Sequence, residues 1–140
     1  MMTDFSCGVI PYRMKDGERE FLLIQHKAGH WAFPKGHPED AEEHAETARR
    51  ELEEETGLGH VALDEDHPFE EYYVFTKRSG KQVRKRVIYF LGEVVTDRAL
   101  RIQISEVSDY AWGNAAKTRE RMTFDEGRAL LDEVLAYLGA

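Results

Sequence analysis

Residues 36–58, GHPEDAEEHAETARRELEEETGL, are the segment that most constrains how this chain folds. The sequence predicts a helix over residues 40–56, and Gly57 suits its C-terminal cap because glycine readily adopts the left-handed conformation found there. At 100° per residue, one narrow stripe of this helix is small or aliphatic: Ala41, Ala45, Ala48 and Leu52. We therefore expect an acidic helix that packs this stripe against a core.

The carboxylates of the helix separate into two sets. Glu51, Glu54 and Glu55 lie beside the apolar stripe, whereas most of the other acids point outward. Like charges three and four residues apart repel, and partial burial increases that cost unless a cation compensates it. Hard divalent cations such as Mg²⁺ take oxygen ligands. From the residues alone, a metal site and a solvated acidic face both remain open.

Alternating apolar residues predict strands on both sides of this helix. Residues 5–13 and 20–27 predict a hairpin that turns at Asp16-Gly17, and residues 29–40 predict a loop. Residues 123–138 predict a second amphipathic helix, with Thr123 and Glu126 as a capping box. Mixed strands and helices in 140 residues predict one α/β domain, residues 1–140. Further strands are expected at residues 61–65, 70–78, 83–95, 100–104 and 109–112.

Composition excludes several classes of protein. The formal net charge of -8 argues against a general attraction to nucleic acid or anionic membranes. No apolar run approaches the ~20 residues of a membrane span, and the N-terminus lacks a signal pattern. Cys7 is a single cysteine and forms no internal disulfide, so a cytoplasmic protein is expected. Residues 77–86, KRSGKQVRKR, are basic and could bring phosphate groups to the acidic helix.

The spacing of residues 36–58 resembles the Nudix box at every specified position. Gly36 and Glu42 are followed, after seven residues, by Arg50-Glu51-Leu52-Glu53-Glu54-Glu55-Thr56-Gly57-Leu58. The resemblance implies an α/β/α sandwich with a mixed central sheet. It also implies hydrolysis of a nucleoside diphosphate linked to another moiety, with Mg²⁺ or Mn²⁺ as the cofactor. Bound metal neutralises phosphate oxygens, orients an attacking water and lowers the pKa of that water.

Roles carry over from this resemblance residue by residue. Glu51, Glu54 and Glu55 are implied as metal ligands, together with the carbonyl of Gly36. Glu54 is also implied in catalysis. Arg50 is also implied in catalysis, and Arg50 and Glu42 are implied to support the loop and the helix.

Two segments resemble the asymmetrical diadenosine tetraphosphate hydrolase branch of this family. In WAFPKGH, residues 31–37, Lys35 and His37 are implied to contact phosphate oxygens. In RKRVIYFLGEV, residues 84–94, Lys85 is implied to bind phosphate and Tyr89 to stack on a base. Alternation along this strand places every second residue, Tyr89 included, on one face.

A third segment, ISEVSDYAW at residues 104–112, adds a further carboxylate. In that branch a glutamate before a Tyr-x-Trp segment is a metal ligand and a candidate catalytic base, which here implies Glu106. The chain departs from the branch at Val107, where histidine is common, and Glu93 is a rival base. The implied reaction is attack of water on one phosphorus, which converts diadenosine tetraphosphate to ATP and AMP.

Other functions share the same box. They include hydrolysis of the RNA 5′-pyrophosphate, of nucleoside triphosphates and of inositol pyrophosphates, for which residues 77–86 would be apt. A non-catalytic nucleotide sensor is a different class of function, and the presence of every box carboxylate argues against it. We expect a small-molecule substrate without membrane or long nucleic acid, and leave the oligomeric state open. Whether Trp31, Phe33 or Tyr73 joins Tyr89 at the base also stays open.

Overall fold

The computed structural model describes residues 1–95, 100–103 and 105–139. In chain order the elements are β1 (Met2–Lys15), β2 (Glu18–His26), β3 (Trp31–Ala32), β4 (Lys35–Gly36), α1 (His44–Thr56), β5 (Val61–Thr76), β6 (Gln82–Val94), β7 (Val107–Gly113), α2 (Ala115–Arg121) and α3 (Asp125–Leu138). No helix in this described part of the chain is long and apolar enough to cross a membrane.

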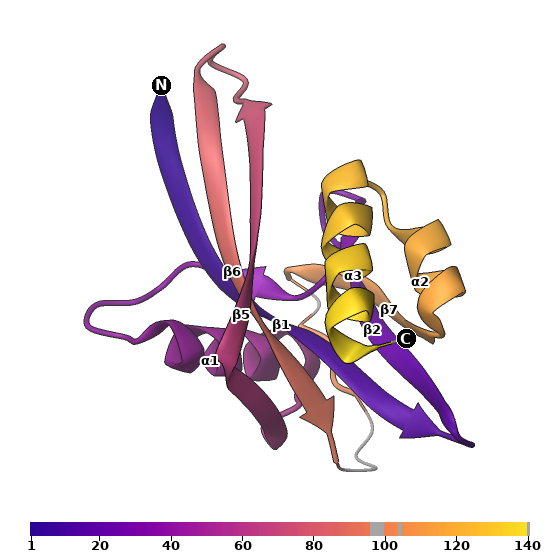
Figure 1. The fold of residues 1–140 in the computed structure, drawn as a ribbon. Coiled ribbons are helices and arrows are strands. Elements are labelled where there is room, and N and C mark those ends of the chain that lie inside the picture. Colours follow the sequence, from indigo (N-terminus) through magenta and orange to yellow (C-terminus); the bar gives the residue numbers. More distant parts are fainter. Residues whose placement is uncertain (96–99, 104, 140) are drawn as a thin grey trace.

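The strands form one mixed sheet between two helical layers. The order is β3-β2-β1-β6-β5, with β4 added to β1 and β7 added to β2. β1 and β6 are parallel, and the other pairs are antiparallel. Helix α1 lies on one face and α3 on the other, while parts of β1, β5 and β6 extend together beyond the helices (Figure 1). The predicted α/β/α sandwich is therefore confirmed.

Alternate residues of β6 pack into two apolar clusters on opposite faces of the sheet, as the sequence pattern predicts. Val87, Tyr89 and Leu91 join the apolar cluster to which α3 contributes. Ile88 and Phe90 join the opposite cluster, which contains the stripe of α1. A strand that is apolar on both faces is stable only when both faces are covered, and this requirement accounts for the two helical layers.

The first hairpin also follows the sequence. Lys15 pairs with Glu18, and the two residues between them, Asp16 and Gly17, have φ values of 51° and 79°. Positive φ at both positions is the geometry of a tight turn that matches the twist of the strands, and Asp-Gly favours it.

Helix α1 begins later than expected. It starts at His44, and Ala41 lies before it with a φ of 64°, so Ala41 is outside the predicted stripe. The residues before the helix form a loop, and Glu42 of this loop accepts hydrogen bonds from Thr47 and Arg50 of α1. The C-terminal end is as predicted, since Gly57 has a φ of 79° and its N–H donates to the carbonyl of Glu53.

Several other boundaries differ from the sequence prediction. Residues 61–65 and 70–78 are not two strands: β5 is continuous, with a shift in register between Asp64 and Phe69. The expected loop at residues 29–40 contains β3 and β4, and α2 was not predicted. Residues 100–103 form no strand, and Ile104 lies outside the described residues.

The predicted capping box of the last helix is wrong. Phe124 is the residue before the first turn of α3, and no side chain caps that end. The hydroxyl of Thr123 instead accepts a hydrogen bond from the backbone N–H of Trp31 at 2.8 Å. This long-range contact fixes the start of α3 beside β3.

Candidate functional site

An acidic cleft lies where α1 meets the loop that follows β4. We use this name for the cleft lined by the box residues together with residues from β1, β2, β6 and the segment before β7. The lining includes His26, Lys35, Gly36, Arg50, Lys85 and four glutamates, Glu51, Glu54, Glu55 and Glu106.

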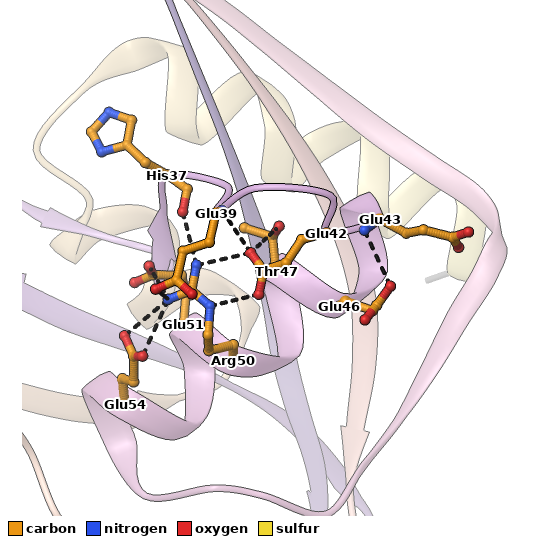
Figure 2. A network of polar contacts seen from close by, with 9 residues as sticks. All are labelled: His37, Glu39, Glu42, Glu43, Glu46, Thr47, Arg50, Glu51 and Glu54. Atoms are coloured by element: carbon orange, nitrogen blue, oxygen red, sulfur yellow. Dashed lines mark hydrogen bonds and ion pairs between the residues drawn. The ribbon is translucent and has the colours of Figure 1, made fainter.

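Arg50 organises the mouth of this cleft (Figure 2). Its Nε donates to Glu42 Oε2 at 2.7 Å, and Nη2 donates to Glu42 Oε1 at 3.0 Å and to the carbonyl of His37 at 2.9 Å. Nη1 donates to Glu51 at 2.9 Å and to Glu54 at 3.2 Å. Hydrogen bonds from Arg50 lower the pKa of Glu42 to about 2. One guanidinium therefore joins the loop to α1 and orients two carboxylates.

Gly36 leaves room for the close approach of Glu51. A Cβ atom at position 36 would lie 2.0 Å from Cδ of Glu51, far inside contact distance. β4 holds this glycine by pairing it with Cys7 of β1. Only a residue without a side chain lets the Glu51 carboxylate lie against the backbone of the loop.

Glu55 is the most deeply buried carboxylate of the cleft. It is 5% exposed, and its Oε1 has no hydrogen-bond partner among the residues that the structure describes. Burial raises the pKa of Glu55 to about 8, the charge of Glu51 adds to the rise, and Lys35 opposes it. Burial likewise raises the pKa of Glu51. A buried carboxylate with one oxygen lacking a partner is a group that a bound cation would stabilise.

The three box carboxylates share the cleft but do not converge on one point. Within residues 1–95, 100–103 and 105–139, no three acidic, imidazole or thiol groups are close enough to form a ready metal-binding set. Arg50 holds Glu51 and Glu54, whereas Glu55 lies buried. The three carboxylates that the helix wheel groups together therefore line one cleft, with different partners.

The basic residues of the cleft differ in what they bind. Lys85 is 4% exposed, and its ammonium donates to Asp4 at 2.8 Å and to Ser6 at 2.6 Å. The exposed ring of His37 lies 3.0 Å from Asp4 and points away from Arg50 (Figure 2). Lys35 has no hydrogen bond or ion pair from its ammonium to any described residue, and burial lowers its pKa. Lys35 is therefore the cation left available to a ligand.

The second candidate carboxylate, Glu106, lines the cleft from the segment before β7. Glu106 is exposed, and its carbonyl accepts the N–H of Lys27, which fixes the segment before β7 to the end of β2. Glu93 pairs with Ala62 of β5 and does not line the cleft, so the rival base is placed elsewhere. Within the described chain, Glu106 and Glu39 are the carboxylates outside α1 that line the cleft, and Glu39 lies 3.5 Å from Arg50 Nη1.

His26 is a cleft residue that sequence reasoning missed. Its Nε2 is buried and has no partner within the described chain, and burial lowers its pKa to about 3. Its ring stacks on that of His30 at 4.4 Å. The sequence shows only a histidine at the end of a strand, and nothing local indicates that the strand ends in a cleft.

An aromatic pocket adjoins the cleft. It is lined by residues of β3, β5 and β6, by the start of α3 and by Lys35. The sequence did not predict that Phe124 lines this pocket, because its position depends on the long-range hydrogen bond between Thr123 and Trp31. The aromatic lining consists of Trp31, Phe33, Tyr73, Phe75, Tyr89 and Phe124.

The position of Tyr89 corrects its expected role. Tyr89 is 1% exposed, and its ring meets the edge of Phe33 at 6.1 Å. A ring with so little exposed surface cannot offer a face to a base, so Tyr89 forms the floor of the aromatic pocket. Phe124, which is 53% exposed, and Tyr73, which is half-buried, have surface available for stacking.

Comparison with known proteins identifies the family. The family model described as the NUDIX domain matches residues 2–133. This chain belongs to the Nudix family. The bis(5′-nucleosyl)-tetraphosphatase [asymmetrical] of Mus musculus is 36% identical to this Nudix protein over 144 residues, which cover 95% of this chain and 94% of the mouse chain.

Solved structures agree with the fold. A Caenorhabditis elegans Ap4A hydrolase in a binary complex superimposes with a TM-score of 0.85 at 27% identity, covering 96% of this Nudix chain and 97% of the other. The dihydroneopterin triphosphate pyrophosphohydrolase of E. coli gives a TM-score of 0.73 at 17% identity, covering 95% of each chain. The second likeness supports the fold alone, so substrate choice has to be argued from the cleft and the pocket.

Proposed function

We propose that this Nudix protein is an asymmetrical dinucleoside tetraphosphatase that hydrolyses diadenosine tetraphosphate to ATP and AMP with Mg²⁺ or Mn²⁺. The mouse relative that bears this name resembles the chain over nearly the whole length of both proteins. The proposal also fits the pairing of an acidic cleft with an aromatic pocket.

The observation that carries the proposal is the position of Lys35. Its side chain lines both the aromatic pocket and the acidic cleft. A nucleoside stacked in the pocket would therefore direct its phosphate chain past an available ammonium group and toward the box carboxylates. Lys85 follows on the same side, although Asp4 and Ser6 already bind it. This order of aromatic, basic and acidic groups suits a substrate with a base, several phosphates and a scissile anhydride.

The residues present fit a divalent cation. The unpartnered oxygen of Glu55 and the contact between Glu51 and the Gly36 backbone place oxygen donors along one wall of the cleft. We assign Glu51, Glu54, Glu55 and the Gly36 carbonyl as holders of the cation, with Glu106, which also lines the cleft, as a further ligand. When bound, the cation neutralises phosphate charge and makes water more acidic.

The protein groups then have distinct tasks. Lys35 offsets negative charge on the phosphate chain, and Arg50 keeps the loop and the α1 carboxylates in position. Glu106, which is exposed at the cleft, accepts the proton of the attacking water, with Glu54 as the box carboxylate next in line. His37 contributes its carbonyl to Arg50 and can reach a phosphate with its exposed ring.

A panel of substrates tests this proposal. The purified chain with Mg²⁺ is assayed on diadenosine tetraphosphate, nucleoside triphosphates, triphosphorylated RNA and an inositol pyrophosphate, with products separated by chromatography. We expect the highest kcat/KM for the dinucleotide and equal yields of ATP and AMP. Equal or faster turnover of any other compound would refute the choice of substrate, and binding of nucleotides without turnover would identify a sensor.

A further inference from the structure

The aromatic pocket contains a carboxyl group that neither the box nor the proposed chemistry uses. Glu71 lies on β5 and points to the same side as Tyr73 and Phe75, which also line the pocket. The side chain is half-buried, and its carboxyl makes no hydrogen bond or ion pair with the part of the chain that the structure describes. A carboxyl group at the wall of an aromatic pocket, without a partner in the described chain, is available to bind a ligand there.

The surroundings of Glu71 favour neither charge state strongly near neutral pH. Burial raises its pKa to about 7, Lys35 of β4 lowers it, and Glu126 of α3 raises it further. The other titratable groups lining the pocket are His30, Tyr73 and Tyr89. Burial lowers the pKa of His30 and raises that of both tyrosines, so these three stay neutral.

A carboxyl group can distinguish the two purines by its hydrogen-bonding pattern. An ionised carboxylate only accepts hydrogen bonds, and it can take two from the N1–H and the amino group of guanine. A protonated carboxyl donates one and accepts one, which matches the N1 acceptor and the amino donor of adenine and removes the preference for the two adjacent donors of guanine. Proteins that stack a base between aromatic side chains commonly read this same edge.

We propose that Glu71 reads the hydrogen-bonding edge of the purine in the aromatic pocket, pairing with guanine when ionised and with adenine when protonated. The inference rests on the proposed function, because it assumes that the pocket receives the base of a dinucleotide. Glu126, the other carboxyl of the pocket, is exposed on the first turn of α3. Its exposure leaves Glu71 as the carboxyl placed to meet a stacked base.

The experiment compares kcat/KM for diguanosine and diadenosine tetraphosphate between pH 6 and 8.5. Both compounds have the same phosphate chain, so effects on the metal and on the chemistry cancel in the ratio. In the unmodified protein the guanine-to-adenine ratio rises with pH as Glu71 ionises. In Glu71→Gln the amide can pair only in the manner of the protonated acid, so the ratio falls about tenfold at pH 8 and no longer depends on pH.

Glu126→Gln is the matched control, since it removes a negative charge from the same pocket. It should keep a guanine-to-adenine ratio that rises with pH, with the rise moved to lower pH because the charge of Glu126 no longer raises the pKa of Glu71. An equal loss for both dinucleotides in Glu71→Gln, as contact with ribose hydroxyls would produce, overturns the inference. Circular dichroism shows that each variant is folded.

Binding separates this inference from the proposed function. Dissociation constants of non-hydrolysable methylene analogues of the two dinucleotides are measured by calorimetry for the same three proteins. A ratio of Kd values that Glu71→Gln does not change overturns the role of Glu71, whether or not turnover occurs. A ratio that changes as expected, in a protein without turnover, supports Glu71 and refutes only the hydrolase assignment.

Discussion

The acidic cleft and the aromatic pocket share Lys35 but are built in opposite ways. Most of the cleft comes from one continuous segment, β4 with its loop and α1. The pocket takes its walls from β3, β5, β6 and the start of α3, which are distant in the chain. The comparison teaches that residues for metal chemistry can be specified by local spacing, whereas a surface for a base depends on how distant elements pack.

The two regions also differ in what stabilises a ligand. The cleft presents carboxylates whose charges are offset by Arg50 or left unpaired, as at Glu55. The pocket presents aromatic surface with few charges. Electrostatic stabilisation acts mainly on the transition state, and stacking acts on the bound substrate as well. Substitutions in the cleft should therefore lower kcat, and substitutions in the pocket should raise KM.

The largest expected effect is that of Glu54→Gln in the cleft. Loss of one ligand oxygen removes several kcal/mol of charge stabilisation, so we expect kcat to fall roughly 1000-fold with the fold retained. Chelation of divalent cations should abolish turnover in the unmodified protein. The control is Glu53→Gln, an exposed neighbour whose carboxylate lies against Gly59 instead of the cleft. Steady-state kinetics with equal losses in both variants would contradict the assignment.

A smaller effect is expected from Tyr73→Ala in the pocket. Stacking of one base is worth ~1–3 kcal/mol, so KM should rise about tenfold while kcat changes little. Tyr72→Ala is the matched control, because Tyr72 is the adjacent residue of β5 and lines a different depression, beside Phe5 and Arg86. If kcat fell and KM stayed constant in Tyr73→Ala, the division between cleft and pocket would be wrong.

The smallest effect concerns stability at the base of the cleft, through Asp4. Burial opposes ionisation of Asp4, but hydrogen bonds from Lys85 and His37 prevail and lower its pKa to about 2. The unfolded chain has the ordinary value near 3.9, so this contribution is complete above about pH 4 and is lost as the pH falls toward 2. Urea unfolding at several pH values should show that Asp4→Asn is destabilised at pH 6 and much less so near pH 2. A constant difference would exclude this linkage.

Sequence patterns predicted the elements that depend on neighbouring residues. The Asp16-Gly17 turn, the Gly57 cap and the alternation of β6 all reflect local backbone freedom or side-chain period, and each is confirmed. The capping box at Thr123 failed because a distant N–H, that of Trp31, competes for the same hydroxyl. The strand expected at residues 100–104 is absent over its described part, 100–103, because the backbone there bonds the end of α1, where the N–H of Arg101 donates to the carbonyl of Thr56.

The residues of the candidate site also divide into those that local sequence predicted and those that only the fold revealed. The sequence by itself determined the family, the α/β/α fold and the group of box residues, because a fixed spacing on one loop and one helix defines them. Only the tertiary structure decided that Tyr89 is buried beneath the aromatic pocket and that Glu93 lies outside the acidic cleft. It also decided that His26 lines the cleft and that Glu71 and Phe124 line the pocket. Their exposure and partners depend on which strands and helices meet, and that packing follows from burial of apolar surface over the whole chain.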